Sequence, residues 1–228
     1  MSSEKLSLSF GETVGDDGVW VQCLNRGQGD APRPTLFLDR DGVILEETHY
    51  LCTVEDTRLM PGAAETIAQA NALCLPVVVV TNQSGIGRGK YGWAEFAAVQ
   101  EKMLDDLADL GAFVNAVMAC PFHDDAKAPW NVTDHPDRKP NPGMLLRAGA
   151  LLAIDYARSW IVGDHATDLA AGKAAGLAGG LHVWCGHGSH PGQRENAWKI
   201  AGDGFKVVEG DSIADVPALV PLIAGDGD

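Results

Sequence analysis

Four consecutive valines, Val77–Val80 in the segment "LPVVVVT", are the feature that most constrains the fold of this chain. An unbroken run of β-branched residues is typical of a strand that is buried on both faces, as in a parallel sheet. Segments with helical spacing separate this strand from further predicted strands, which lie at 35–39, 112–120, 159–164, 180–185 and 205–210. This alternation predicts an α/β protein with a doubly wound, Rossmann-like, mainly parallel sheet and helices on both faces.

Composition narrows the class of protein. A chain of 228 residues is long enough for one full domain with appendages. A net charge of −14 disfavours binding to nucleic acid or to an anionic membrane, since both attract basic proteins. No apolar run is long enough to span a bilayer, the N-terminus lacks a signal-peptide pattern, and five scattered cysteines suit a reducing compartment. We therefore expect a cytoplasmic monomer or small homo-oligomer without nucleic-acid or membrane partners.

The chain divides into two unequal parts. Residues 1–34 are rich in Gly, Ser and Asp and end in the linker-like segment "DAPRP". They contain the alternating piece "GVWVQCL", which predicts an added strand or hairpin. The strand and helix alternation occupies 35–228, where long predicted helices cover 141–154 and 212–223. We therefore expect an N-terminal extension followed by one main domain.

Polar side chains stand where several predicted strands end. The carboxylates of Asp39 and Asp41 are one residue apart and would repel each other, so a metal ion, a shared proton or solvent must compensate their charge. The ends of parallel strands meet at one edge of the sheet, where ligands bind. The residues at these ends are Asp39, Asp41, Thr81, Asp164 and Asp168, and Lys139 precedes a predicted helix. Such a set suits phosphoryl transfer assisted by Mg²⁺, which binds through a few carboxylates and the substrate phosphate.

Four motifs in this order carry a resemblance to a known family: "FLDRDGV", "TNQSGIGRG", "RKPNPGM" and "VGDHATDLAAGKAAG". Over about 35–220 the sequence resembles the haloacid dehalogenase superfamily of aspartate-nucleophile phosphatases. It looks most like the branch that holds D-glycero-D-manno-heptose 1,7-bisphosphate phosphatase and histidinol-phosphate phosphatase. The resemblance implies that 35–228 form a phosphatase domain. No segment between the motifs is long enough for a large cap domain.

The resemblance implies a role for each matching residue. Asp39 is expected to be the nucleophile that forms an aspartyl phosphate, and Asp41 the general acid and base. Thr81 and Lys139 are expected to bind phosphoryl oxygens. Mg²⁺ is expected to be held by Asp39, Asp164 and the backbone carbonyl of Asp41, with Asp168 supporting them. Substrate contacts are expected from Glu47, His49, Tyr50, Asn82, Gln83, Ser84, Arg138 and His165.

The loop before Arg138 departs from the heptose enzymes. Those enzymes carry a zinc loop of the form Cys-x-His followed by Cys-x-Cys. Here the first half reads "CPFH", with Phe122 in place of the histidine, and the second half reads "HPD". We expect that structural zinc has been lost and that Pro129 and Trp130 anchor the loop instead. A zinc site built from substitute ligands is the alternative, and its ligands would be Cys120, His123, His135 and Asp137.

These observations favour a Mg²⁺-dependent phosphomonoester hydrolase that acts on a small sugar phosphate, first of all D-glycero-D-manno-heptose 1,7-bisphosphate. Histidinol phosphate or another small phosphorylated metabolite is an alternative substrate. A non-hydrolytic alternative is a receiver-like or phosphate-binding protein, because such proteins also place an acidic pocket on a doubly wound sheet. The isolated histidines His182, His187 and His190 are expected to be structural or surface residues.

Overall fold

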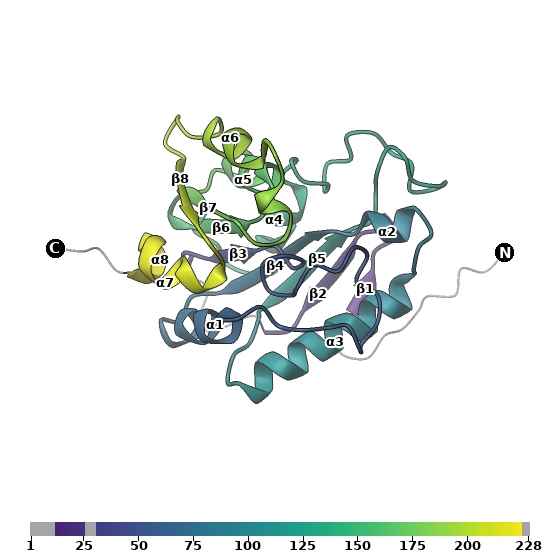
Figure 1. Ribbon diagram of the computed structural model, residues 1–228, viewed down its shortest axis with the longest axis horizontal. Helices are drawn as coiled ribbons and strands as arrows, with labels where there is room; N and C mark the ends of the chain where they lie inside the picture. The colour runs from purple at the N-terminus through teal and green to yellow at the C-terminus, as the bar shows by residue number, and fades with distance from the viewer. Residues whose placement is uncertain (1–11, 26–30, 225–228) are drawn as a thin grey trace.

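The computed structural model describes residues 12–25 and 31–224. Its strands form one eight-stranded sheet in the order β1-β2-β5-β4-β3-β6-β7-β8 (Figure 1). The pairs from β5 to β8 are parallel, and the pairs β1–β2 and β2–β5 are antiparallel. The strands are β1 (Glu12–Val14), β2 (Trp20–Cys23), β3 (Leu36–Leu38), β4 (Val77–Asn82), β5 (Ala116–Cys120), β6 (Trp160–Gly163), β7 (Gly179–Val183) and β8 (Lys206–Gly210).

Helices cover both faces of this sheet, which confirms the predicted doubly wound α/β class (Figure 1). One face is covered by α1 (Ala63–Ala72) and α3 (Trp93–Asp109). The other face is covered by α4 (Gly143–Ala148), α5 (Ala166–Ala174) and α6 (Gln193–Trp198). The shorter elements are α2 (Ser84–Gly87), α7 (Val216–Leu219), α8 (Pro221–Ala224) and the 3-10 turns η1 (Tyr156–Arg158), η2 (Gly186–Ser189) and η3 (Ile213–Asp215).

The valine run is buried on both faces, as predicted. All four valines are fully buried; Val77 and Val79 pack in the core beneath α1 and α3, and Val78 and Val80 pack beneath α4 and α5. Because successive side chains of a strand point to opposite faces, one run of apolar residues serves both halves of the core. Within the described ranges, no helix is long and apolar enough to cross a lipid bilayer.

The N-terminal segment forms a hairpin that belongs to the main sheet. β1 and β2 pair with each other, and β2 pairs with β5. Trp20 on β2 is fully buried; its indole stacks on Trp93 at 5.5 Å and meets the edge of Phe96 at 5.0 Å between ring centroids. The added strand or hairpin expected here is therefore present over 12–25. Residues 1–11 and 26–30 lie outside the described residues, and the boundary at residue 34 stays a prediction.

Two predicted helices are shorter than expected, each for a local reason. α4 ends at Ala148, where the Tyr156 hydroxyl donates to the carbonyl of Leu145, and the N–H of Gly149 bonds to Leu146 instead. The C-terminal helix expected over 212–223 is divided into η3, α7 and α8. Val220 is extended before Pro221, because a residue that precedes proline is pushed out of the helical region.

The burial of Trp20 generates a stability prediction. Replacing Trp20 with Ala should lower the free energy of unfolding by about 3–5 kcal/mol, the usual cost of deleting a buried aromatic side chain. Trp198 is 47% exposed, so Trp198→Ala is the matched control and should cost less than about 1 kcal/mol. Urea unfolding followed by circular dichroism measures both values. A loss below about 1 kcal/mol in Trp20→Ala would show that the hairpin does not contribute to the stability of the main core.

Candidate active site

The candidate site is a cavity of about 370 Å³ at the carboxyl ends of the central strands. β3 lies between β4 and β6, and the chain runs from β3 through β4 to β5 before it returns to β6 on the other side of β3. Strand order therefore reverses next to β3, and ligands bind in the crevice at such a switch point. Asp39 directly follows β3, Thr81 lies near the end of β4, and Asp164 directly follows β6. All three residues line the cavity.

Lys139 forms the electrostatic centre of the cavity wall. Its ammonium lies 2.9 Å from Asp39 Oδ1 and 2.7 Å from Asp168 Oδ1, and it donates to the carbonyl of Val80 at 2.7 Å. Burial raises the pKa of Asp39, Lys139 opposes that rise, and the carboxylates of Asp168 and Asp164 add to it, so the pKa reaches about 7. Burial alone would lower the pKa of Lys139, but its two carboxylate partners raise it above its usual range, so the ammonium stays charged.

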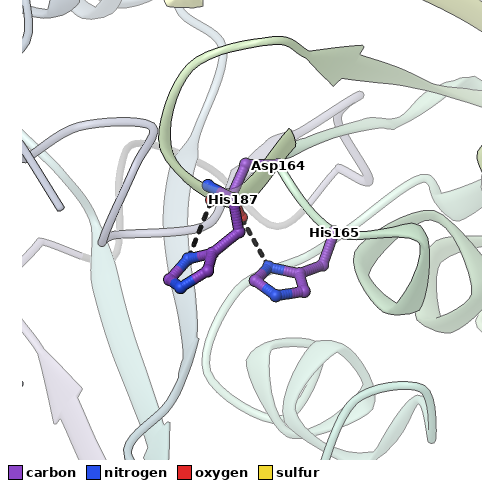
Figure 2. A group of neighbouring side chains, drawn as sticks. All are labelled: Asp164, His165 and His187. Carbon is purple, nitrogen blue, oxygen red and sulfur yellow. Dashed lines mark hydrogen bonds and ion pairs between the residues drawn. The ribbon is translucent and has the colours of Figure 1, made fainter. Parts of the chain in front are cut away.

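Two histidines contact Asp164, one at each oxygen of its carboxylate (Figure 2). The His165 ring Nδ1 lies 2.8 Å from Asp164 Oδ1, and the backbone N–H of His187 donates to Oδ2 at 2.7 Å. Burial raises the pKa of Asp164, but hydrogen bonds from both histidines outweigh burial and hold it well below its usual range. Burial also opposes the charged form of His165, yet Asp164 raises the pKa of that imidazole to about 9. This side of the cavity therefore carries an ionised carboxylate and a cationic ring.

A second network holds the carboxylate of Asp41. Arg40 donates two hydrogen bonds of 3.0 and 3.1 Å to this carboxylate. The Arg40 side chain is fully buried, and its guanidinium carbon lies 4.8 Å from the centroid of the Phe96 ring. The Gln83 amide donates to Asp41 Oδ2 at 2.7 Å and to Thr81 Oγ1 at 2.8 Å. The Tyr91 hydroxyl donates to the amide oxygen of Gln83. These contacts fix Gln83 between the two residues expected to act on the phosphate, so Gln83 is in a position to orient both.

Both the oxygen and the nitrogen of the Asn82 side-chain amide form hydrogen bonds with the backbone of Lys139. Its Oδ1 accepts from the Lys139 N–H and its Nδ2 donates to the Lys139 carbonyl, each at 3.1 Å. This reciprocal pair ties β4 to the loop before α4. Asn82 was expected to contact substrate, and it lines the cavity, but its side chain also positions Lys139.

The segment 47–50 forms the outer wall of the cavity. His49 and Tyr50 have positive φ angles of 54° and 68°, a conformation that costs non-glycine residues energy and occurs at sites where the surrounding structure enforces it. The carboxylate of Glu47 accepts from the His49 N–H at 2.6 Å, and the Tyr50 hydroxyl accepts from Arg88 at 2.7 Å. These contacts hold the strained turn against the basic side of the cavity.

The four alternative zinc ligands do not form a group with ligand atoms within 4.8 Å of one another, although His135 Nδ1 lies 3.8 Å from Asp137 Oδ2. Cys120 is buried, and burial raises the pKa of its thiol to about 12. His123 lies 3.0 Å from the Arg88 guanidinium, and His135 stacks on Phe122 with ring centroids 3.8 Å apart and planes 5° from parallel. Asp137 is paired with Arg147 at 2.6 and 2.7 Å. Each side chain therefore has a partner of its own, and this set does not fit a closed tetrahedral zinc site.

The anchors of that loop are only partly those expected. Trp130 packs edge-on against Phe122 with centroids 5.3 Å apart, as predicted for an anchor. Pro129 is exposed, so its prediction as an anchor was wrong. The Phe122–His135 stack and the Asp137–Arg147 ion pair anchor the loop together with Trp130.

The structure gathers the whole predicted site into one cavity. Its lining includes all the residues expected as catalytic, metal-binding, substrate-contacting or supporting: Asp39, Asp41, Glu47, His49, Tyr50, Thr81, Asn82, Gln83, Ser84, Arg138, Lys139, Asp164, His165 and Asp168. His187, which was expected to be a structural or surface residue, also lines the cavity. Sequence reasoning also did not assign Tyr91 or Thr167 to the cavity. The resemblance defines no role for the positions of His187, Tyr91 and Thr167, so the motifs gave no signal for them.

The carboxylates present a donor set that suits a hard cation. Asp39, Asp164 and Asp168 each offer a carboxylate oxygen, and these atoms lie within 4.8 Å of one another. Mg²⁺ prefers oxygen ligands of this kind. Asp168 is already bonded to Lys139 and accepts from the His165 N–H at 2.9 Å, so it serves the lysine and the helix start. Asp39 and Asp164, which also contact Lys139 and His165, are the two carboxylates that the resemblance assigns to the cation.

Comparison with known proteins identifies the relatives of this chain. The family described as HAD-hydrolase-like matches residues 137–205. The D-glycero-beta-D-manno-heptose-1,7-bisphosphate 7-phosphatase of Mesorhizobium japonicum is 48% identical over 168 residues, which cover 74% of this chain and 77% of that protein. The protein of the same name from Rhodopseudomonas palustris is 42% identical over 147 residues, with 64% of this chain and 82% of that protein covered.

A solved structure supports the same assignment. The crystal structure of D,D-heptose 1,7-bisphosphate phosphatase from B. bronchiseptica, complexed with magnesium and phosphate, superposes with a TM-score of 0.65 at 30% identity. The match covers 81% of this chain and 96% of that one. Relatives of this similarity, aligned over most of their length, show that the chain belongs to the haloacid dehalogenase-like (HAD-like) hydrolases and is a phosphatase of that family.

Proposed function

We propose that the protein hydrolyses D-glycero-beta-D-manno-heptose 1,7-bisphosphate or a closely related sugar bisphosphate, with Mg²⁺ as cofactor. The observation that carries this proposal is the cavity itself, in which Lys139 and two carboxylates meet at the strand ends while two arginines line the same space. Arg88 and Arg138 are held by Tyr50 and by the Phe122 carbonyl. A substrate with two phosphates needs two cationic regions, and the relatives named for such a substrate are the most similar ones reported above.

Asp39 is the proposed nucleophile. Its carboxylate attacks the phosphorus atom, so a bond from Asp39 to phosphorus forms and the bond from phosphorus to the sugar oxygen breaks. Lys139 and the Thr81 hydroxyl donate to the phosphoryl oxygens, whose charge has to be stabilised in the transition state. Burial, together with the neighbouring carboxylates, raises the pKa of Asp39, so further positive charge beside it would favour the anion that attacks. When bound to Asp39 and Asp164, Mg²⁺ supplies that charge.

Asp41 is the proposed proton carrier. In its protonated form it gives a proton to the departing sugar alkoxide, and the resulting carboxylate then takes a proton from water. That water attacks phosphorus, the bond to Asp39 breaks, and inorganic phosphate is released. The fork of Arg40 and the amide of Gln83 hold the Asp41 carboxylate in one orientation for both transfers.

A phosphate-release screen tests the proposed activity. With Mg²⁺, the heptose bisphosphate should be hydrolysed faster than sugar monophosphates, nucleotides and histidinol phosphate. Exhaustive treatment with EDTA should stop release, and added Mg²⁺ should restore it. Asp39→Asn should release no phosphate while keeping the circular dichroism spectrum of the wild type. Full activity in chelator, or near-normal activity of Asp39→Asn, would disprove the mechanism, and a preference for histidinol phosphate would disprove the substrate.

A second prediction concerns the proton carrier. Asp41→Asn should reduce kcat by about 10²–10⁴-fold, the usual contribution of general acid–base catalysis. Glu46→Gln is the control, because Glu46 is an exposed neighbouring acid outside the cavity lining. Steady-state kinetics on the same substrate measure both. A loss below about tenfold in Asp41→Asn would mean that another group moves the proton.

We further propose that the loop before Arg138 is ordered without zinc. His135 is stacked on Phe122, and Arg147 pairs with Asp137. A structural zinc site needs four ligands in a closed tetrahedron, and among the described residues this set is not one of the groups whose ligand atoms lie within 4.8 Å of one another. Packing and one ion pair then take over the role of the metal.

Metal analysis tests this proposal. Protein purified without added zinc and without chelator should contain well under one zinc per chain, and Cys120→Ser should have the KM of the wild type. A closed four-ligand site would keep its zinc through such a purification, because its affinity for the metal is high. About one zinc per chain in the wild type that is lost in Cys120→Ser would contradict the proposal.

A further inference from the structure

Asp164, His165 and His187 form a compact group on the C-terminal side of the cavity. Asp164 follows β6, His165 precedes α5, and His187 lies in η2 after β7. Both imidazole rings turn toward the one carboxylate (Figure 2). Nδ1 of His165 lies 2.8 Å from Asp164 Oδ1, and Nδ1 of His187 lies 3.6 Å from Asp164 Oδ2. One ligand atom from each residue lies within 4.8 Å of the others.

Close backbone packing brings η2 to this place. A Cβ at Gly186 would lie 2.3 Å from Asp164 Oδ2, and Gly186 has a φ of +56°. A Cβ at Gly188 would lie 1.8 Å from the carbonyl of Val183. Only glycine allows the turn to pass this close, and the approach is what carries the His187 ring to the carboxylate. The grouping therefore depends on the path of the backbone and not on a chance rotamer of one surface side chain.

The donor set differs from that of the Mg²⁺ position. Two imidazoles and one carboxylate favour first-row transition ions such as Zn²⁺, Co²⁺ and Ni²⁺, whereas Mg²⁺ prefers oxygen alone. Metal–ligand bonds of about 2.0–2.2 Å require ligand atoms roughly 3–3.6 Å apart around one ion, so small side-chain rotations would bring these atoms into register. The His165 and His187 side chains are 36% and 31% exposed and line the cavity, so an ion from solvent can reach them.

We propose that Asp164, His165 and His187 form a second cation site that binds a first-row transition ion such as Zn²⁺ or Co²⁺ in exchange for the extra proton of the His165 ring, and that shares Asp164 with the Mg²⁺ position. Three protein ligands leave one coordination position open to water, as in open metal sites. Because Asp164 is shared, a transition ion held by the histidines competes with Mg²⁺ for this carboxylate. Occupation of the site should therefore slow phosphate release, and this consequence rests on the proposed function.

Cobalt titration tests the site without any substrate. Co²⁺ added to the magnesium-free full chain should bind at one equivalent and develop the visible absorption of a nitrogen-coordinated ion, and Zn²⁺ should displace it. His165→Gln and His187→Gln should each weaken Co²⁺ binding by at least about tenfold, because loss of even an outer partner of a ligand costs about 10–100-fold in affinity. In His187→Gln the backbone N–H of residue 187 can still donate to Asp164 Oδ2.

His190→Gln is the matched control. The His190 ring lies 4.9 Å from that of His187 but is outside the ligand group, so this variant should bind Co²⁺ as the wild type does. Binding that is unchanged in His165→Gln and His187→Gln would place the ion on carboxylates alone and overturn the proposal. Absence of binding would also overturn it, and so would an equal loss in His190→Gln.

The kinetic consequence has a separate readout. Zn²⁺ should inhibit Mg²⁺-supported phosphate release, excess Mg²⁺ should relieve the inhibition, and His187→Gln should need at least about tenfold more Zn²⁺ for the same inhibition. If no phosphate is released from any substrate, the proposed function fails while the cobalt titration still decides the site. Inhibition that is unchanged in His187→Gln would show that Zn²⁺ acts at another position.

Discussion

The buried ammonium of Lys139, held between Asp39 and Asp168, is the interaction on which the rest of the site depends. Removing a charged group from water costs on the order of several kcal/mol per ion, and the cost is recovered only with good geometry and hydrogen bonds to the remaining atoms. Lys139 meets that condition with two carboxylates and the Val80 carbonyl. Asn82 fixes its backbone from β4. One cation thus joins β3, β4, α5 and the loop before α4.

The parallel sheet explains why these residues meet although they are far apart in the chain. Asp39 and Asp164 follow β3 and β6, which are neighbours in the sheet with Leu38 opposite Val162. Each strand is positioned by apolar side chains on both faces, so the packing of the core determines the separation of the carboxylates at its edge. A substitution that shifted β3 against β6 would therefore disturb the site without touching any of the proposed catalytic groups.

Much of this arrangement could be predicted from the sequence because its signals are local. Asp39, Thr81 and Asp164 stand directly at the ends of apolar runs, and parallel strands bring such ends to one edge. His187 could not be placed in the same way. It reaches the cavity through a glycine turn whose path depends on contact with Asp164, and no pattern in "CGHGSH" indicates that contact. The length of α4 failed for the same reason, since the Tyr156 hydroxyl that ends it comes from another element, whereas the break before Pro221 has a local cause.

The loop before Arg138 is tied to the N-terminal hairpin, a link that the sequence does not indicate. Arg147 on α4 bonds Asp137 of the loop and also Asp17 of the hairpin turn at 2.6 Å. The Trp130 ring lies against Gly18, where φ is +80° and a Cβ would come within 2.4 Å of the ring. The same turn thus contacts the loop by charge and by packing. Since Asp137 directly precedes Arg138 and Lys139, the hairpin supports the segment that supplies the cations of the site, and an element outside the family motifs becomes part of its architecture.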